Sequence, residues 1–212
     1  MLSCCAPCSA GAIRQLAQGA IENVSDFIIL FFNPNIFPES EYLKRMKEQI
    51  KYCEETGVKY AVLEYDHDAW RTAVQGFETE PERGARCSLC FEYRFRRAVK
   101  FAQENGFNAI GSVLGVSRHK SQPQVDMAAE KAVSDFSHPL SVLPTSPAKG
   151  GGNYTATQLN NEKVNAPDYS GDGKNITYLP IKWDENLRVQ INRESDFYRQ
   201  NYCGCEFSIR KL

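Results

Sequence analysis

Long apolar runs are missing from this sequence of 212 residues, and their absence limits where the protein works. No stretch reaches the roughly 18 consecutive apolar residues that a membrane-spanning helix needs. The amino terminus also lacks the basic start and apolar core of a secretory signal peptide. We therefore predict an intracellular, cytoplasmic protein without membrane association, in which thiols stay reduced.

An excess of charge of either sign is missing too. The net charge is −1, with 25 Lys and Arg against 26 Asp and Glu, so the overall balance does not attract nucleic acid. Basic residues nevertheless gather at positions 83–100 and at Arg118, His119 and Lys120. Such charges most often belong to solvated helix faces, but they also suit a rim that contacts phosphates.

Cysteine, by contrast, is abundant, with eight residues in the chain. Seven of them fall in three tight clusters and are the candidate metal ligands: Cys4, Cys5, Cys8, Cys87, Cys90, Cys203 and Cys205. Adjacent Cys4 and Cys5 are a poor framework for disulfides. Reduced thiolates are soft ligands that select zinc, copper(I) or iron–sulfur clusters.

Cys53 stands apart from these clusters. It lies at helical spacing from Ile50 and Met46, which predicts that it is buried as a small hydrophobic residue.

The number of clustered thiols exceeds what a single metal centre uses. A structural zinc site and an iron–sulfur cubane each take four protein ligands. Three protein ligands with an open fourth position are typical of a reactive metal site. The count therefore suggests one saturated centre and one open centre. Because adjacent side chains do not easily face the same metal, we expect Cys4 and Cys5 to serve different centres.

Strands and helices alternate along the chain. Apolar runs predict buried strands at 26–33, 58–65, 107–115 and 176–182. Capping residues and amphipathic patterns predict helices at 9–18, 39–56, 66–75, 88–104, 122–135 and 184–196. This alternation predicts an α/β fold, a doubly wound and mainly parallel sheet with helices on both faces, in one domain over 1–212. Ligands of such sheets bind at the carboxyl ends of the strands, where the cysteine clusters can converge.

Residues 136–175 interrupt the alternation. The segment contains Pro139, Pro144, Pro147, Pro167 and the triple glycine 150–152, without a sustained hydrophobic period. We predict a long loop or lid there.

Four motifs, taken together and in order, resemble QueH-type epoxyqueuosine reductases. They are Cys4-Cys5-Ala-Pro-Cys8-Ser9, Phe32-Asn-Pro-Asn-Ile36, Cys87-x-x-Cys90-Phe91-x-x-Arg94 and Tyr198-Arg-Gln-Asn-Tyr-Cys203-Gly-Cys205. The match is collinear and covers nearly the whole chain outside 136–175. The resemblance implies a Rossmann-like domain related to the HUP and PP-loop ATPases, with a 4Fe–4S cluster next to a separate mononuclear iron.

The resemblance also implies a reaction and its partners. The epoxide of epoxyqueuosine at the wobble position of tRNA is reduced to queuosine, the last step of queuosine biosynthesis, without cobalamin. The reduction takes two electrons and two protons and releases water. Its partners are the anticodon loop of tRNA and an external electron donor such as a ferredoxin or flavodoxin. The iron is expected to act as a Lewis acid on the epoxide oxygen.

Individual site residues follow from the resemblance or from their position. Cys5, Cys87, Cys90 and Cys203 are the candidate ligands of the cluster that the resemblance implies, and the division of the seven thiols between cluster and iron stays open. A proton donor is also needed, and four residues are candidates by position: Tyr198, Tyr202, Asp66 and His119. For the two tyrosines a packing role is the alternative, and for His119 an exposed loop position. Arg94 and Arg199 are candidates for holding phosphate or cluster charge, with an ordinary salt bridge as the alternative.

The sequence departs from the family pattern in two ways, and two alternative functions are compatible with parts of it. Only three residues precede Cys4, fewer than the family usually has, and the segment 136–175 is longer. One rival is a zinc-stapled nucleic-acid-binding protein without redox activity, although a zinc staple needs four thiols rather than seven. The other is a PP-loop-type nucleotide enzyme, although the turn after the first strand lacks an S-G-G-x-D-S phosphate loop.

Overall fold

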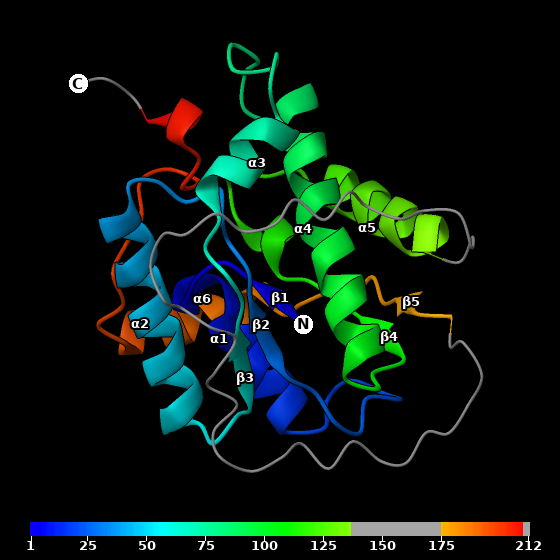
Figure 1. Ribbon diagram of the computed structural model, residues 1–212. Helices are drawn as coiled ribbons and strands as arrows, with labels where there is room; N and C mark the ends of the chain where they lie inside the picture. Colours follow the sequence, from blue (N-terminus) through cyan, green and yellow to red (C-terminus); the bar gives the residue numbers. More distant parts are fainter. Residues whose placement is uncertain (137–174, 210–212) are drawn as a thin grey trace.

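Five parallel strands form the centre of the computed structural model, which describes residues 1–136 and 175–209 (Figure 1). The strands are β1 (Leu2–Ser3), β2 (Ile29–Phe31), β3 (Tyr60–Val62), β4 (Ala109–Ile110) and β5 (Thr177–Tyr178). The first three pair as one sheet and the last two as another. Leu2 joins them, because it bridges in parallel to Ser112 and its N–H donates to the Gly111 carbonyl at 2.8 Å. The resulting order β3-β2-β1-β4-β5 confirms the predicted Rossmann-like α/β fold.

The helices begin close to where the sequence predicts, and local chemistry explains their starts. They are α1 (Ala6–Ala17), α2 (Glu39–Glu55), α3 (His67–Ala73), α4 (Ala85–Glu104), α5 (Gln122–Phe136) and α6 (Glu185–Glu194), with short 3₁₀ helices η1 (Leu114–Val116) and η2 (Glu206–Ser208). Asp66 caps α3 by accepting from the Ala69 N–H at 2.9 Å, and Asp184 caps α6.

Two helices start earlier than the sequence predicts. Helix α1 includes Pro7 in its first turn, where its missing N–H is not needed, and α4 begins directly after Gly84.

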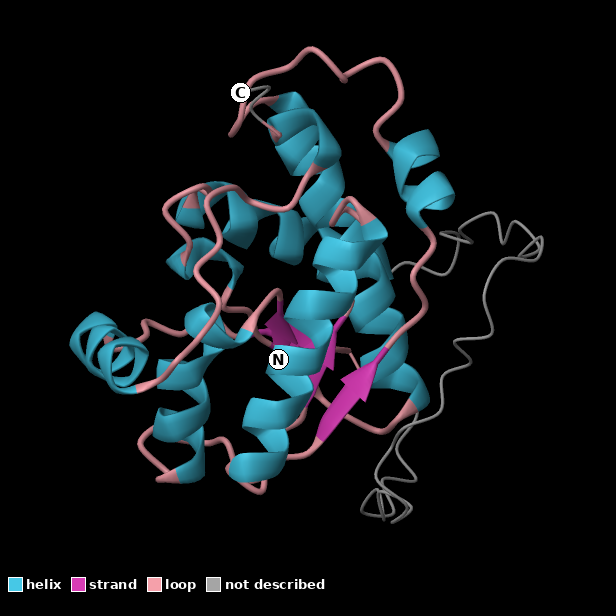
Figure 2. Cartoon of the chain, turned by 90° about the vertical axis from the view of Figure 1, so that its left-hand side faces the viewer, coloured by secondary structure: helices cyan, strands magenta, loops and turns pink. Residues whose placement is uncertain are grey.

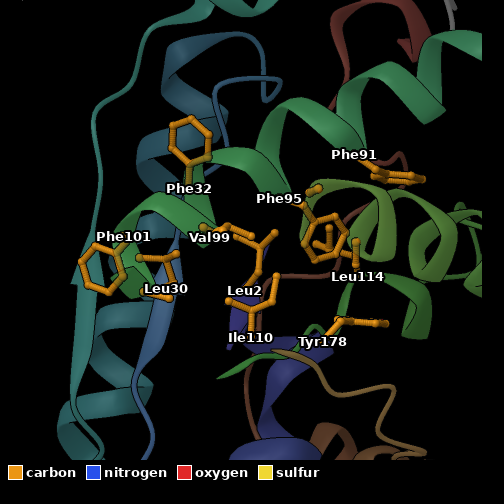
Figure 3. Close-up of a cluster of buried hydrophobic side chains, with 14 of the residues drawn as sticks. Leu2, Leu30, Phe32, Phe91, Phe95, Val99, Phe101, Ile110, Leu114 and Tyr178 are labelled. Atoms are coloured by element: carbon orange, nitrogen blue, oxygen red, sulfur yellow. The ribbon is translucent and has the colours of Figure 1, made fainter. Parts of the chain in front are cut away.

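Helices cover both faces of the sheet (Figure 2). On one face, Leu2, Leu30 and Ile110 point toward Phe95 and Val99 of α4 in a core that α5 completes (Figure 3). On the other face, Ile29 of β2 packs with α1, α2 and α6 in a second apolar cluster. Side chains of a strand alternate between the two faces. Because both faces are covered, the strands read as continuous apolar runs.

The regular strands are shorter than the predicted ones. Strand β2 covers Ile29–Phe31 where the sequence predicts 26–33, and β4 covers Ala109–Ile110 where it predicts 107–115. Buried apolar residues continue beyond the regular pairing, and the Leu63 N–H still donates to the Phe31 carbonyl at 3.0 Å. An apolar run reports burial, whereas a strand also requires regular pairing, so the prediction overestimates the length.

Part of the chain and part of the prediction fall outside this description. The loop or lid predicted for about 136–175 lies outside the described residues, except for its two end residues. Among the helices that the structure describes, none combines the length and the apolar composition needed to cross a membrane.

Candidate metal centre

The first three cysteines gather at the turn between β1 and α1. Cys5 is the residue before the helix and has an extended backbone, with φ −178° and ψ 157°. The sulfur atoms of Cys4, Cys5 and Cys8 lie within 4.8 Å of one another and can hold a metal ion. Those of Cys4 and Cys5 are 3.7 Å apart. The change from strand to helix at Cys5 thus brings the two neighbouring sulfurs together, and the expectation that they serve different metals stays a prediction. We call this group the three-cysteine site.

The other four clustered cysteines line a small enclosed cavity, which we call the four-cysteine site. Cys87 and Cys90 come from the first two turns of α4, where the spacing of three places both on one helix face. Cys203 and Cys205 come from the segment before η2, which lies beside α3 and the start of α4 in Figure 1. The prediction from the sequence grouped Cys5 with Cys87, Cys90 and Cys203. In the structure the fourth thiol of this cavity is Cys205.

Gly204 allows the chain to turn between the two C-terminal cysteines. Its φ is +102°, and a Cβ atom there would lie 2.9 Å from Cγ1 of Ile36 and 3.1 Å from Nη1 of Arg45. Only glycine combines this backbone angle with so close an approach. The Cys205 N–H then donates to the Cys203 sulfur at 3.4 Å, which directs both cysteines to one cavity.

Lys120 lies between the two cysteine sites. Its Nζ is 3.8 Å from the Cys4 sulfur, and its side chain also lines the four-cysteine cavity. Burial lowers the pKa of Lys120, but the nearby negative charge of the cysteines, chiefly Cys4, outweighs this effect and raises the pKa above its ordinary value. The ammonium group therefore stays charged and offsets thiolate charge in both sites.

Each site contains one readily ionised thiol beside thiols that keep their protons. The pKa of Cys4 is well below its ordinary value because Cys5 and Cys8 donate hydrogen bonds to its sulfur. The hydrogen bond to Cys4 raises the pKa of Cys8 to about 12. In the second site, the hydrogen bond from Cys205 lowers the pKa of Cys203 to about 6, and the same bond raises the pKa of Cys205. A metal ion bound to either site would displace the remaining protons.

Buried arginines hold the segments that carry the cysteines. Arg94 is 1% exposed and donates from Nε to the Phe32 carbonyl at 3.1 Å and from Nη2 to the Asn33 side chain. Asn33 in turn donates to the Ser3 carbonyl at 2.9 Å, next to Cys4. The buried guanidinium thus holds the end of β2 directly and the end of β1 through Asn33, beside the three-cysteine site. Arg94 also lines the four-cysteine cavity.

Arg45 performs the same task for the C-terminal cysteines. It is 1% exposed, pairs with Glu41 at 2.7 Å, and donates to the carbonyls of Cys203 and Tyr202 at 3.3 and 3.4 Å. His67 secures the end of the same segment, since its Nε2 lies 2.5 Å from Glu206 and its Nδ1–H donates to a loop carbonyl. These contacts tie the last part of the described chain to α2 and α3.

The four predicted proton donors lie in different surroundings. His119 lines both the four-cysteine cavity and an adjacent open groove, and its Nδ1 is 3.6 Å from Glu82. The hydroxyl of Tyr198 donates to Glu41 at 3.0 Å, and that of Tyr202 donates to the Phe37 carbonyl at 2.5 Å. Asp66 is the cap of α3. A catalytic role for these residues stays a prediction, and His119 is the one that lies beside the cysteines.

Two residues of the site escaped sequence reasoning as individuals. Lys120 was visible only as part of a basic group with Arg118 and His119, although its position soon after the strand predicted at 107–115 was a usable signal. Gln200 accepts a hydrogen bond from the Cys5 thiol at 3.2 Å. It lies between the motif residues Tyr198 and Cys203, but its residue type alone carries no signal for this contact.

The fold and the site together define a Rossmann-like α/β protein with a group of three cysteines after its first strand that could hold a metal ion. The sequence matches the family model for epoxyqueuosine reductase QueH over residues 1–171 and 156–211. Curated relatives named epoxyqueuosine reductase QueH include one from Acinetobacter baylyi, 34% identical over 98% of this chain and 78% of the relative. Those from Histophilus somni and Haemophilus influenzae are 33% and 31% identical, each over 98% of this chain and 70% of the relative. The chain belongs to the QueH family.

Proposed function

We propose that this protein is an epoxyqueuosine reductase, which converts epoxyqueuosine in tRNA to queuosine. The reaction consumes two electrons and two protons, removes the epoxide oxygen as water and leaves a carbon–carbon double bond. The observation that carries the proposal is the division of seven cysteines into sites of four and three with Lys120 between them, in a chain of the QueH family.

The four-cysteine site suits a 4Fe–4S cluster, because a cubane takes four thiolate ligands. Among the described residues that line the cavity none is a carboxylate, so no hard oxygen ligand competes. Three cationic side chains line it and offset the negative charge of bound thiolates: Arg86, Arg94 and Lys120. The three-cysteine site would then hold the additional iron, with a position left for substrate. When bound, these groups supply single electrons and a Lewis acid.

The remaining work falls to side chains around the open groove. Cys8 is half-buried and lines the groove, whereas Cys4 and Cys5 are buried beneath it. A substrate in the groove therefore meets the three-cysteine site at Cys8. His119 also lines the groove, with its Nδ1 3.6 Å from Glu82 and its Nε2 accepting from Arg118 at 3.4 Å. It is our candidate for the proton donor to the departing oxygen, a role that requires the doubly protonated ring with Nε2–H released from Arg118.

Two partners follow from this chemistry. The substrate is the anticodon loop of a tRNA that carries epoxyqueuosine. The electrons come from an external donor such as a ferredoxin or flavodoxin, because the two-electron reduction needs a source outside the chain. Neither step involves a membrane.

Metal content gives the first test of the proposal. Protein purified without oxygen should be brown and contain more than four iron atoms per chain, as a cubane plus one iron requires. Colourless protein that holds only zinc after anaerobic iron–sulfur reconstitution would favour the zinc-stapled alternative and defeat the redox proposal.

Analysis of tRNA gives the decisive test. A strain that lacks this protein and any second reductase should accumulate epoxyqueuosine, and the purified enzyme with a chemical reductant should convert it to queuosine. The control is the Cys53→Ala variant, since Cys53 is buried away from both sites against Gln49. Normal queuosine in the deletion strain would rule out the proposed function.

A further inference from the structure

An open groove of about 590 Å³ lies beside the three-cysteine site, within the size range of small-molecule sites. Pro7 and Cys8 at the start of α1 line it, together with residues 115–120 on one side and residues of α6 and of 197–200 on the other. Most of its charged lining residues are cations, although the chain as a whole has a net charge of −1. A local positive groove in a nearly neutral protein indicates an anionic ligand.

Two of these cations form no polar side-chain contact within the described part of the chain. Arg193 and Arg199 are exposed, and no described residue forms an ion pair or hydrogen bond with either side chain. Arg118 is exposed in the loop that lines the groove with Cys8. Arg188 differs from them, because it pairs with Glu185 and its backbone and Cβ pack directly against Gly11. The groove therefore contains one structural arginine, Arg188, and three exposed ones, of which Arg118 bonds through its side chain only to its neighbour His119 among the described residues.

Two amide side chains of the same groove have unused hydrogen-bonding capacity. Asn192 donates from Nδ2 to the Pro7 carbonyl at 2.9 Å, but its Oδ1 is buried without a partner among the described residues. Gln200 accepts from Cys5 through Oε1, and its Nε2 is likewise buried without a partner there. Buried amide atoms are normally hydrogen-bonded. A donor and an acceptor that line one groove can both be satisfied by a polar ligand.

We propose that this groove binds an RNA strand through the phosphates on either side of the target nucleoside. Arg193 and Arg199 hold the backbone from one wall and Arg118 from the other, while Asn192 and Gln200 bond the nucleoside between them. Guanidinium groups suit this task because they bind phosphate oxygens in a bidentate manner. The identity of the nucleoside rests on the proposed function, whereas the binding of the strand does not.

The proposal has a consequence for substrate choice. A free nucleoside carries no phosphates and would gain only the contacts to Asn192, Gln200 and Cys8. The enzyme should therefore act on epoxyqueuosine in an anticodon stem-loop at a far lower KM than on the free nucleoside. Substituting Arg193 and Arg199 should remove this preference by raising KM for the stem-loop, with little change in kcat.

Binding of an unmodified anticodon stem-loop RNA to the anaerobically purified protein tests the groove without any turnover. We expect Arg193→Gln/Arg199→Gln to weaken binding about tenfold or more. The slope of log K against log salt should fall by roughly 1.4, since each single-strand phosphate contact contributes about 0.7. The matched control is Arg14→Gln, because Arg14 is exposed on α1 and is not part of the groove lining. Equal affinity and equal salt slope in the double variant and the wild type would overturn the proposal.

The same variants separate this inference from the proposed function. If the protein binds the RNA through these arginines but never reduces epoxyqueuosine, RNA binding in the groove is supported and the proposed reductase activity is rejected. If the enzyme is active and its KM for the stem-loop is unchanged in Arg193→Gln/Arg199→Gln, RNA binding in the groove is rejected and the reductase activity is still supported. Equal KM values for stem-loop and free nucleoside would also reject the groove.

Discussion

The two cysteine sites use the same ligand chemistry but depend on the fold in different ways. The three-cysteine site is local, since one strand-to-helix turn places Cys4, Cys5 and Cys8 together. The four-cysteine site joins the start of α4 to the C-terminal segment, which Arg45 and the contact between His67 and Glu206 hold against the rest of the chain. A site within one turn thus needs few contacts from the rest of the chain. A site formed by two distant segments needs buried polar contacts, such as those of Arg45 and His67, that hold the segments together.

Access to the open groove also separates the two sites. Each site has one half-buried cysteine, Cys87 in the four-cysteine site and Cys8 in the three-cysteine site. Of these two, Cys8 lines the groove and Cys87 does not. A closed site protects a redox group from solvent, and an open one admits a substrate. The experiments below test this difference, beginning with the largest expected effect.

Removing one thiol from each site should have different consequences. We expect Cys8→Ala to lose turnover by about 10³-fold or more, because it removes the ligand that faces the groove, yet to keep the brown colour of the cluster. Cys90→Ala should lose the colour as well as the activity. Iron content, visible absorbance and turnover measure this. An active Cys8→Ala enzyme, or one as colourless as Cys90→Ala, would contradict the division into two sites.

Arg45→Met should damage the assembled site far more than the local one. It leaves the Glu41 carboxylate buried without its partner, which costs about 3–5 kcal/mol in the free energy of unfolding. Urea unfolding measures the loss, and amide hydrogen exchange should show the greatest loss of protection near Cys203. Arg14→Met is the matched control on an exposed helix position. Uniform loss of protection across the sheet would contradict the idea that Arg45 mainly holds the C-terminal segment.

His67→Phe should loosen the same segment by a smaller amount. The phenyl ring can keep the stacking with Phe37 and Trp70, but Glu206 loses its hydrogen-bond partner, at about 1–3 kcal/mol. Glu206→Gln is the companion variant, and the two changes together should cost less than their sum, as coupled residues do. Strict additivity in a double-mutant cycle would show that the contact does not act as a unit.

Metal binding to the three-cysteine site should depend steeply on pH. In a Cys87→Ala/Cys90→Ala background, Co²⁺ binding must displace protons from Cys5 and Cys8, whose pKa values are raised by their hydrogen bonds to Cys4. A raised thiol pKa keeps the proton on at neutral pH, so affinity should increase as pH rises. Release of two protons predicts about a hundredfold gain per pH unit between roughly pH 6 and 8. A flat profile by Co²⁺ absorbance would mean that the thiols are already ionised.

The smallest effects are expected at the two tyrosines. Their hydroxyls are bonded to Glu41 and to the Phe37 carbonyl, so Tyr198→Phe and Tyr202→Phe should change turnover by less than about tenfold. Loss of a general acid lowers turnover about 10²–10⁴-fold, and we expect a loss of that size for His119→Asn instead. If either tyrosine variant shows the larger loss, the proton donor lies on the C-terminal segment.

Local patterns were sufficient to predict much of the architecture. Continuous apolar runs report strands buried on both faces, Pro7 suits the first turn of a helix, and Asp66 and Asp184 cap the helices that follow them. These features act over a few residues, so they can be read without tertiary contacts. The regular strands were shorter than predicted because burial extends beyond regular pairing.

The sequence by itself determined the alternation that makes a parallel sheet, the presence of the C-x-x-C motif near the start of α4, and the grouping of seven thiols in three clusters. The tertiary structure alone decided how these thiols divide, because the division depends on where each side chain points after strand, helix and C-terminal segment have packed together. It also placed Lys120 between the two sites and the tyrosine hydroxyls elsewhere. Local interactions encode the elements, and only long-range packing assembles the site.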